Sequence, residues 1–240
     1  MTSKMRHFAS LLVVTLAALS GVLPGSARAE GWHLAGGVGT TFPTDIGGRL
    51  DLEIPGRLLV SSSVGYLPHA YFSLINDTVQ SFGAYDEDTA ALIDAITQGG
   101  WVWRSHLGWR PFKKAGFFFQ LGYGHVELSG NLDDTDALAD AVNEPRIAGA
   151  DVSAHAKAVL HQLDGQIGWR WVIAHRLFIR AALGGFWTFS SSTTMTTQSS
   201  AASRPTALVL ARSGEAYLDR TFKSYAHSPT ASLSVGYQFF

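Results

Sequence analysis

Few side chains in this sequence have types and spacings that suit catalysis, and the first candidate is a histidine beside a serine. His227 and Ser228 belong to the stretch AHSP at 226–229. A serine becomes a nucleophile only when a nearby base takes its proton. Adjacent residues of a strand point to opposite faces. The pair therefore favours a junction between a loop and a strand over a nucleophile with its base.

An acidic run is the second candidate. The stretch NLDDTDALAD at 131–140 contains Asp133, Asp134, Asp136 and Asp140. Carboxylate oxygens bind calcium, but a calcium loop of the EF-hand type also needs a glycine at its turn and a glutamate at its end. This run has neither. We therefore expect the solvated start of a helix here, with no metal and no cofactor.

Charged residues also recur on the polar side of alternating segments, which is a pattern of ion pairs rather than of catalysis. Arg104 lies six residues before Arg110, and Asp164 lies six residues before Arg170, both near the short-turn end of such a segment. We expect them at similar depth, where the arginine fork can reach the carboxylate. The charges that we assign to the interior on this basis are Asp51, Glu53, Arg104, Arg110, Asp164, Arg170 and Arg180. Their remaining donors would be satisfied by Ser61, Ser63, Gln120, Gln162 and Gln166.

The segments that carry these charges read as β-strands with one apolar and one polar face. Strict alternation of this kind is typical of strands. Eight segments show it, at about 31–41, 46–54, 57–67, 99–110, 115–128, 154–172, 176–190 and 229–240. Short connections near 54–57, 110–116 and 172–176 alternate with longer ones at 68–98, 129–153 and 191–228, the first connection at 41–48 being brief. Short turns at one rim and long loops at the other are typical of bacterial outer-membrane barrels.

The apolar face is predicted to point outward. An eight-stranded barrel has an interior that side chains just fill, so it has no room for this many aromatic rings. Aromatic residues also gather at the ends of the segments, where they would form belts at the two membrane–water boundaries. The tryptophans expected in these belts are Trp101, Trp103, Trp109, Trp169, Trp171 and Trp187.

The N-terminus reads as an export signal. Lys4 and Arg6 precede an uncharged apolar run at 8–23, and Ala27 and Ala29 are the small residues expected before a cleavage site. We expect residues 1–29 to be removed and residues 30–240 to form one barrel domain. The whole chain carries 18 basic and 19 acidic residues, and three of the bases lie within 1–29, so the mature chain would carry 15 against 19. This balance favours no nucleic-acid partner, and the absence of cysteine excludes disulfides.

The last segment resembles the closing strand of a known protein class. The apolar positions of PTASLSVGYQFF at 229–240 are Leu233, Val235, Tyr237 and Phe239, followed by Phe240. Together with the eight segments, they make the chain resemble small outer-membrane β-barrels of the OmpA, OmpX and OmpW type. The resemblance implies an all-β, eight-stranded antiparallel transmembrane barrel in the bacterial outer membrane. It also implies that this strand is the signal read by the barrel-assembly machinery.

The long connections are expected to contain short helices over the barrel mouth. Within 71–98, apolar residues fall near helical spacing and an acidic first turn precedes a second group. The connection after the seventh segment begins with SSSTTMTTQSSAAS, which reads as a flexible low-complexity run. The next stretch predicts a helix with Pro205 in its first turn and Leu208, Leu218 and Phe222 on its apolar side. These helices would be a ligand-binding platform or a packed cap.

Four basic side chains share the outward face near the long-loop end: His125, His155, Lys157 and His161. They would contact lipopolysaccharide phosphates or lie exposed above the bilayer. The function that we expect is non-catalytic, in a monomeric barrel with a plugged polar lumen and a structural or surface-binding role among outer-membrane lipids. Two alternatives remain: a narrow conduit or binder for small apolar ligands, and a lipid A-modifying hydrolase. The hydrolase alternative is suggested by His227 and Ser228.

Overall fold

The structure is a computed structural model that describes residues 32–71, 73, 94, 97–112, 115–132, 139, 153–173, 176–198 and 204–239. Several sequence predictions fall outside these residues. They are the export signal at 1–29, most of the helical pattern within 71–98, the acidic cluster of Asp133, Asp134, Asp136 and Asp140, and the final Phe240.

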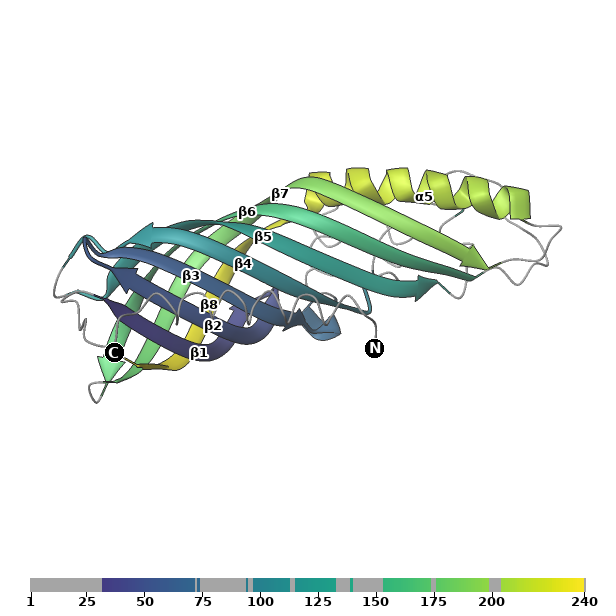
Figure 1. The fold of residues 1–240 in the computed structure, drawn as a ribbon. Helices are drawn as coiled ribbons and strands as arrows, with labels where there is room; N and C mark the ends of the chain where they lie inside the picture. Colours follow the sequence, from purple (N-terminus) through teal and green to yellow (C-terminus); the bar gives the residue numbers. More distant parts are fainter. Residues whose placement is uncertain are drawn as a thin grey trace, which may run out of the picture.

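Eight antiparallel strands close into a barrel (Figure 1). Each strand pairs with the next along the chain, and β1 pairs with β8, from Ala35 opposite Gln238 to Phe42 opposite Ala231. The predicted all-β, eight-stranded barrel is therefore confirmed. The strands are β1 (His33–Phe42), β2 (Asp45–Ile54), β3 (Leu58–Leu67), β4 (Gly99–Trp109), β5 (Phe117–Leu132), β6 (Ser153–Ile173), β7 (Leu177–Gln198) and β8 (His227–Gln238).

Three strands are much longer than the other five, which makes one wall of the barrel taller. β5, β6 and β7 have 16, 21 and 22 residues, whereas β1, β2 and β3 have 10 each. The prediction of a flexible run from residue 190 was wrong for its first part, because β7 continues to Gln198. Pairing with β6, from His161 opposite Ser190 to Ser153 opposite Gln198, orders this serine- and threonine-rich stretch. We call residues 126–132, 153–161 and 190–198 the extension.

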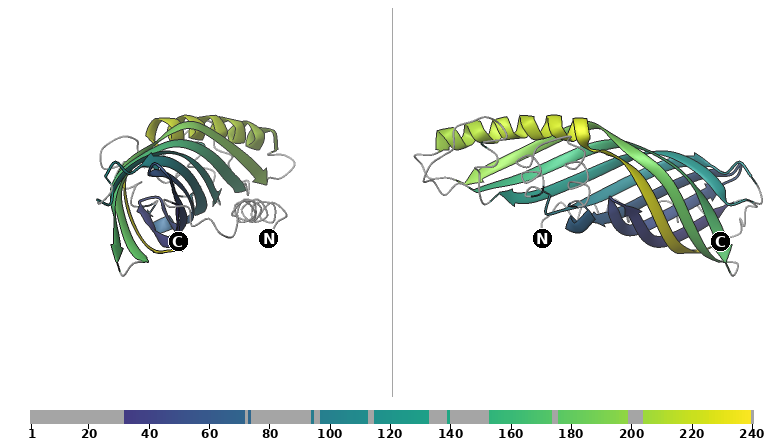
Figure 2. Two further views of the ribbon diagram at one scale, coloured as in Figure 1. Left: turned by 60° about the vertical axis from the view of Figure 1, so that its left-hand side comes forward. Right: turned by 180° about the vertical axis from the view of Figure 1, so that it is seen from behind.

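Helix α5 (Arg204–Tyr225) runs along the extension beside β7 (Figures 1 and 2). Its buried face consists of Ala207, Leu210, Ala211, Leu218 and Phe222. This face packs against the inward-pointing side chains of the extension, including Leu128, Leu160 and Met195. The predicted helix is confirmed, but Leu208 is not on its apolar side, because that side chain is 52% exposed.

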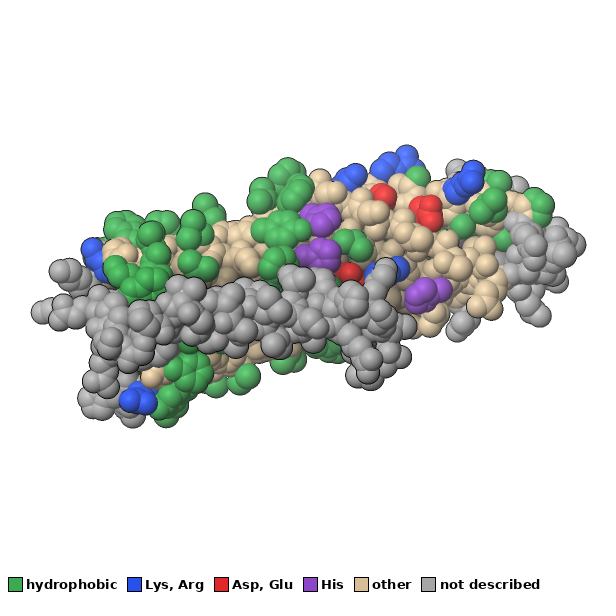
Figure 3. Space-filling model, in the orientation of Figure 1, with side chains coloured by type: hydrophobic (Ala, Val, Ile, Leu, Met, Phe, Trp, Pro, Cys, Tyr) green, Lys and Arg blue, Asp and Glu red, His purple; other side chains and the backbone are tan. Residues whose placement is uncertain are grey.

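The two faces of the barrel wall differ as the alternation predicts. Leu107, Leu121 and Leu183 point outward and are 63%, 70% and 66% exposed. Their inward neighbours His106, Gln120 and Ala182 have exposures below a tenth. Figure 3 shows apolar side chains gathered over the barrel, while most charged side chains on that face lie toward the extension. Among the residues that the structure describes, no helix has the length and apolarity needed to cross a membrane.

Candidate functional site: the barrel interior and its outer mouth

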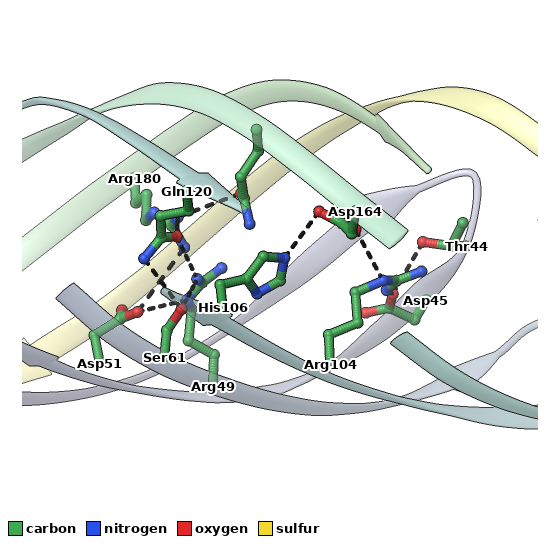
Figure 4. Close-up of polar contacts among 11 residues, drawn as sticks. Thr44, Asp45, Arg49, Asp51, Ser61, Arg104, His106, Gln120, Asp164 and Arg180 are labelled. Atoms are coloured by element: carbon green, nitrogen blue, oxygen red, sulfur yellow. Dashed lines mark hydrogen bonds and ion pairs between the residues drawn. The ribbon is translucent and has the colours of Figure 1, made fainter. Parts of the chain in front are cut away.

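The polar side chains inside the barrel form three groups at successive depths. The one nearest the extension, which we call the outer cluster, consists of Asp45, Arg104, His106 and Asp164 (Figure 4). Arg104 Nε lies 3.2 Å from Asp164 Oδ2, and its Nη1 contacts Asp45 Oδ2. His106 Nε2 lies 2.8 Å from Asp164 Oδ1. The cluster therefore links β2, β4 and β6 across the interior.

Glycines on β5 make this crossing possible. In the strand register, Gly122 lies between His106 on β4 and Asp164 on β6. A Cβ on Gly122 would stand 2.5 Å from His106 Cδ2 and 2.5 Å from the Ser105 carbonyl oxygen. A glycine at position 122 therefore leaves the space that the His106 ring needs to reach the Asp164 carboxylate across β5.

A middle cluster lies deeper and consists of Arg49, Asp51, Ser61, Gln120 and Arg180 (Figure 4). Arg49 Nε donates to Asp51 Oδ1 at 2.9 Å, and its Nη2 donates to Ser61 Oγ at 3.1 Å. The Gln120 amide oxygen accepts from Arg180 Nη2, and its Nε2 donates to Ser61 Oγ at 3.2 Å. A fully buried amide thus joins the two guanidinium groups.

A rim cluster lies at the short-turn end. Arg110 Nη1 donates to Glu53 Oε2 at 2.6 Å, and Arg170 Nη2 donates to Gln238 Oε1 at 3.1 Å. Two inward phenylalanines complete the packing. The guanidinium carbon of Arg170 lies 4.3 Å from the ring centre of Phe178, and that of Arg180 lies 4.1 Å from the ring centre of Phe118. Such cation–π contacts let an arginine rest on an apolar surface without losing all favourable electrostatics.

All seven charges chosen from the sequence thus point inward, but their partners differ in part from the expected ones. Arg104 and Asp164 meet, and Glu53 pairs with Arg110. Arg49, Asp45 and His106 were not in the expected network. The alternation did contain the signal for Arg49, which shares the parity of Asp51. Asp45 lay in a stretch assigned to a connection, so its parity could not be used.

The predicted hydrogen-bonding role of the amides is only partly realised. Gln120 and Gln166 accept hydrogen bonds from Arg180. Gln162 instead donates from Nε2 to Thr188 Oγ1 at 3.2 Å. Within the described part of the chain, Gln162 Oε1 and Arg104 Nη2 are buried atoms without a hydrogen-bond partner. Six further buried atoms of the described residues lack a hydrogen-bond partner, but apart from Arg104 Nε they belong to residues deeper in the barrel, namely Asp51, His106, Arg110, Arg170 and Arg180.

An apolar cavity of about 80 Å³ lies above the outer cluster, at the mouth of the barrel. Its walls include Leu67, Val102, Val126, Leu160 and Phe186. The last turn of α5 contributes Phe222 and Tyr225, and the polar side chains that reach the cavity include Arg104 and Gln162. The predicted position of a helix at the barrel mouth is thus seen for the C-terminal end of α5.

His227 and Ser228 are the first residues of β8 and also line this cavity. The Ser228 hydroxyl donates to the Pro229 carbonyl oxygen at 2.9 Å. His227 is an exposed residue opposite Trp187 in the β7–β8 register. The pair therefore has the arrangement of a strand start, which gives no activated serine.

Two of the four outward basic residues contact each other on the outside of β5 and β6. The rings of His125 and His161 lie 5.3 Å apart, and the Tyr123 hydroxyl lies 2.5 Å from His161 Nδ1. Lys157 Nζ pairs with Glu127 Oε2 at 2.7 Å. His155 lies farther along the extension, with Nδ1 2.8 Å from Asn131 Oδ1. The structure thus brings His125 and His161 together, whereas Lys157 is neutralised by Glu127 and His155 lies apart.

The residues assigned to the belts and to the last strand also point outward. Trp109, Trp169, Trp171 and Trp187 are between 38% and 55% exposed, while Trp101 and Trp103 are half-buried against neighbouring rings. On β8 the outward side chains are Leu233, Val235 and Tyr237. Beyond the strand, the Phe239 amide donates to the Leu34 carbonyl at 2.8 Å. Their roles as membrane belts and as an assembly signal remain predictions.

The comparisons with known proteins found similarity only among solved structures. No family model matches the chain, and no curated protein matches it. The crystal structure of Acinetobacter baumannii CarO is 12% identical, with a TM-score of 0.38 over 85% of this chain and 96% of that one. A major outer membrane protein from Thermus thermophilus is also 12% identical, with a TM-score of 0.40 over 88% and 100%. The described chain is thus an eight-stranded antiparallel barrel with an apolar exterior, and one of the solved structures that it resembles is an outer-membrane protein.

Proposed function

We propose that this protein is an integral barrel of the bacterial outer membrane whose interior is sealed by its own charged side chains. The outward apolar surface supports membrane insertion, because side chains such as Leu121 and Leu183 would otherwise lie in water. Closure of β1 onto β8 supports it too, since an open sheet edge is not tolerated in lipid. An export signal at 1–29 would bring the chain to the assembly machinery.

The observation that carries the sealed-barrel proposal is the position of Arg104. This guanidinium is 3% exposed and contacts carboxylates that belong to β2 and β6, so it bridges the interior of the barrel. The middle cluster adds a second polar layer beneath it. In a narrow eight-stranded barrel, two such layers leave no continuous aqueous path.

The proposed role is structural or surface-binding, without catalysis. The tall wall formed by the extension and backed by α5 is the part that would extend toward the cell exterior. Outer-membrane lipids and lipopolysaccharide would surround the barrel, with the outward histidines near the lipid headgroups. The eight described strands close the barrel within one chain, which supports a monomer.

The sealed barrel is tested by conductance. Protein refolded into detergent should first show heat-modifiable migration in gels, which establishes a folded barrel. In planar bilayers the wild type should then give no steady conductance. An Arg104→Ser, Asp164→Ser variant should gain conductance, whereas Arg176→Ser, at the exposed rim where Arg176 contacts Tyr237, should not. A stable ohmic channel in the wild type would refute the proposal.

A second candidate function is the binding of small apolar molecules. The cavity at the C-terminal end of α5 favours this function, because most of the side chains that line it are apolar. A lipid-modifying hydrolase has less support, since the Ser228 hydroxyl donates to the Pro229 carbonyl.

A further inference from the structure

The cavity at the barrel mouth combines apolar walls with an incompletely bonded polar floor. Val102, Val126 and Leu160 contribute inward side chains from three adjacent strands, and Phe222 closes the cavity from α5. All four are at most 5% exposed. Its volume of about 80 Å³ is several times the roughly 10–15 Å³ that a single water needs. The space is therefore larger than an ordinary packing defect.

The floor offers one hydrogen-bond donor and one acceptor. Among the residues that the structure describes, Arg104 Nη2 and Gln162 Oε1 are both buried and have no partner. Arg104 and Gln162 are 3% exposed and both line the cavity. Other buried polar atoms of the described interior also lack a partner, but apart from Arg104 Nε they belong to residues that do not line the cavity. Because each unbonded buried polar atom is costly, a group bound in the cavity would be stabilised by bonding to these two.

Gly124 places these two side chains beside one another. In the strand register it lies between Arg104 on β4 and Gln162 on β6. A Cβ on Gly124 would stand 3.4 Å from Gln162 Oε1 and 3.7 Å from Arg104 Cγ. Both side chains therefore approach the same point on the inner wall, and one small head group could contact both.

The charges near the floor decide which head group fits. Arg104 already contacts the carboxylates of Asp45 and Asp164. An incoming anion would meet these two carboxylates, and an incoming cation would meet the guanidinium. A hydroxyl or a primary amide is neutral, and it can donate to Gln162 Oε1 while it accepts from Arg104 Nη2.

We propose that this cavity is a binding site for a small neutral amphiphile with a hydroxyl or amide head and a short hydrocarbon body. The head lies on the floor between Arg104 and Gln162, and the body lies against Val102, Val126 and Phe222. Such a division, with apolar walls and a few convergent polar groups, is typical of small-molecule sites. This inference rests on the second candidate function and names its ligand class, and it is independent of the sealed barrel because binding at the mouth requires no path through the interior.

The test uses n-hexanol with a photoreactive diazirine on its chain. The full-length mature protein is placed in lipid nanodiscs and irradiated with the probe, and the labelled peptides are mapped by mass spectrometry. Labelling should appear on the peptide that contains Val126 and on the one that contains Phe222. Unlabelled n-hexanol should compete for these sites, whereas hexanoate should compete far less because of the two carboxylates.

Two variants make the test specific. Val126→Phe fills the cavity and should abolish labelling near Phe222, whereas the matched change Leu121→Phe, on the lipid side of the same strand, should not. Gln162→Met removes the acceptor while Thr188 Oγ1 keeps the Ala226 carbonyl as its own acceptor. It should raise the n-hexanol concentration needed for half-competition about three- to tenfold, because the loss of one net hydrogen bond weakens binding by about that factor. Heat-modifiable migration establishes that each variant is folded.

The proposal fails if labelling is confined to lipid-facing positions such as Leu121, or if Val126→Phe leaves the pattern unchanged. It also fails if no peptide of the cavity is labelled, because the cavity would then hold only water. Equal competition by hexanol and hexanoate would overturn the neutral head group. None of these results depends on conductance, so they are distinguishable from a failure of the sealed-barrel proposal.

Discussion

Arg104 on β4 and Asp164 on β6 approach to 3.2 Å although β5 lies between their strands. β5 presents glycine at both intervening inward positions, Gly122 and Gly124, and a side chain at Gly122 would collide with the His106 ring. The side chains of β4 and β6 therefore meet over a bare stretch of backbone. This relationship lets the outer cluster bridge the interior of the barrel from β2 to β6.

Removing Arg104 should destabilise the barrel more than removing the charge of Asp164. Arg104→Met leaves Asp45 and Asp164 buried without their shared cation, which costs roughly 3–5 kcal/mol. Asp164→Asn leaves Arg104 paired with Asp45 and should cost less. Urea unfolding of refolded protein measures both, with Arg176→Met at the exposed rim as a control. Equal losses for the first two variants would contradict the bridging role of Arg104.

The two inward glycines of β5 should respond differently to alanine. Gly122→Ala places a methyl group 2.5 Å from the His106 ring and from a backbone oxygen, so the wall must shift, at a cost of about 1–3 kcal/mol. Gly124→Ala meets only ordinary contacts, the nearest at 3.4 Å, and should be nearly neutral. The same unfolding assay compares them. A neutral Gly122→Ala would show that the cluster adapts easily.

Arginine on the lipid face should destabilise the barrel. Ile167 is 57% exposed on the outside of β6, and Leu107 is 63% exposed on β4. Arginine at either position would cost about 2–4 kcal/mol near the bilayer midplane. Gln166→Glu is the inward comparison, since it places a charge beside Arg180. If Gln166→Glu lowered the stability measured by vesicle refolding more than the two arginine substitutions did, the inward and outward faces would have been assigned the wrong way round.

Gly108, the other inward neighbour of these positions, is unsuitable for that comparison. A Cβ there would stand 2.3 Å from Gln120 Cγ and 2.3 Å from the Phe119 carbonyl oxygen. A polar side chain is therefore not tolerated at Gly108 despite its inward position, because the inner wall leaves no room for one.

Asp219 should hold α5 on the extension. Its Oδ1 accepts from the hydroxyls of Ser191 and Thr193 at 3.0 and 2.8 Å. Asp219→Ala removes both bonds to a charged acceptor, each worth about 1.5–3 kcal/mol. Limited proteolysis should then cut between β7 and α5 sooner, while the barrel keeps its heat-modifiable migration. Arg220→Ala, whose side chain bonds only to its own helix at the Ala216 carbonyl among the described contacts, should leave the cleavage rate unchanged.

Deletion of Phe239 and Phe240 should leave export intact but prevent assembly. The deletion removes the Phe239 amide that bonds to Leu34 at the β1–β8 seam, together with the outward aromatic side chain. Fractionation should find the precursor processed but absent from the outer membrane. Phe112→Ala, an exposed phenylalanine at the short-turn end, is the control for a simple loss of an aromatic ring. Normal assembly of the truncated protein would show that the last strand is not the signal.

The alternation of the sequence determined the strands and the face that each side chain occupies. Because a strand has a period of two residues, Leu107, Ile167 and Arg104 could be assigned to the outside or inside without a structure. The helical pattern after Pro205 likewise predicted α5. These features depend on local geometry, which the order of residues specifies directly.

Only the tertiary structure decided which inward residues meet and how far the strands extend. A bulge shifts the register between β6 and β7 at His161 and Gln162. The inward positions of β7 are therefore even-numbered up to Thr188 and odd-numbered from Ser191 onward. Strict alternation cannot anticipate such a shift, because an added residue in one strand is fixed by pairing with its neighbour. The serine- and threonine-rich end of β7 is a strand because β6 pairs with it and α5 packs against it. Its composition alone indicated a flexible loop, since contacts between distant segments are not encoded in the local sequence.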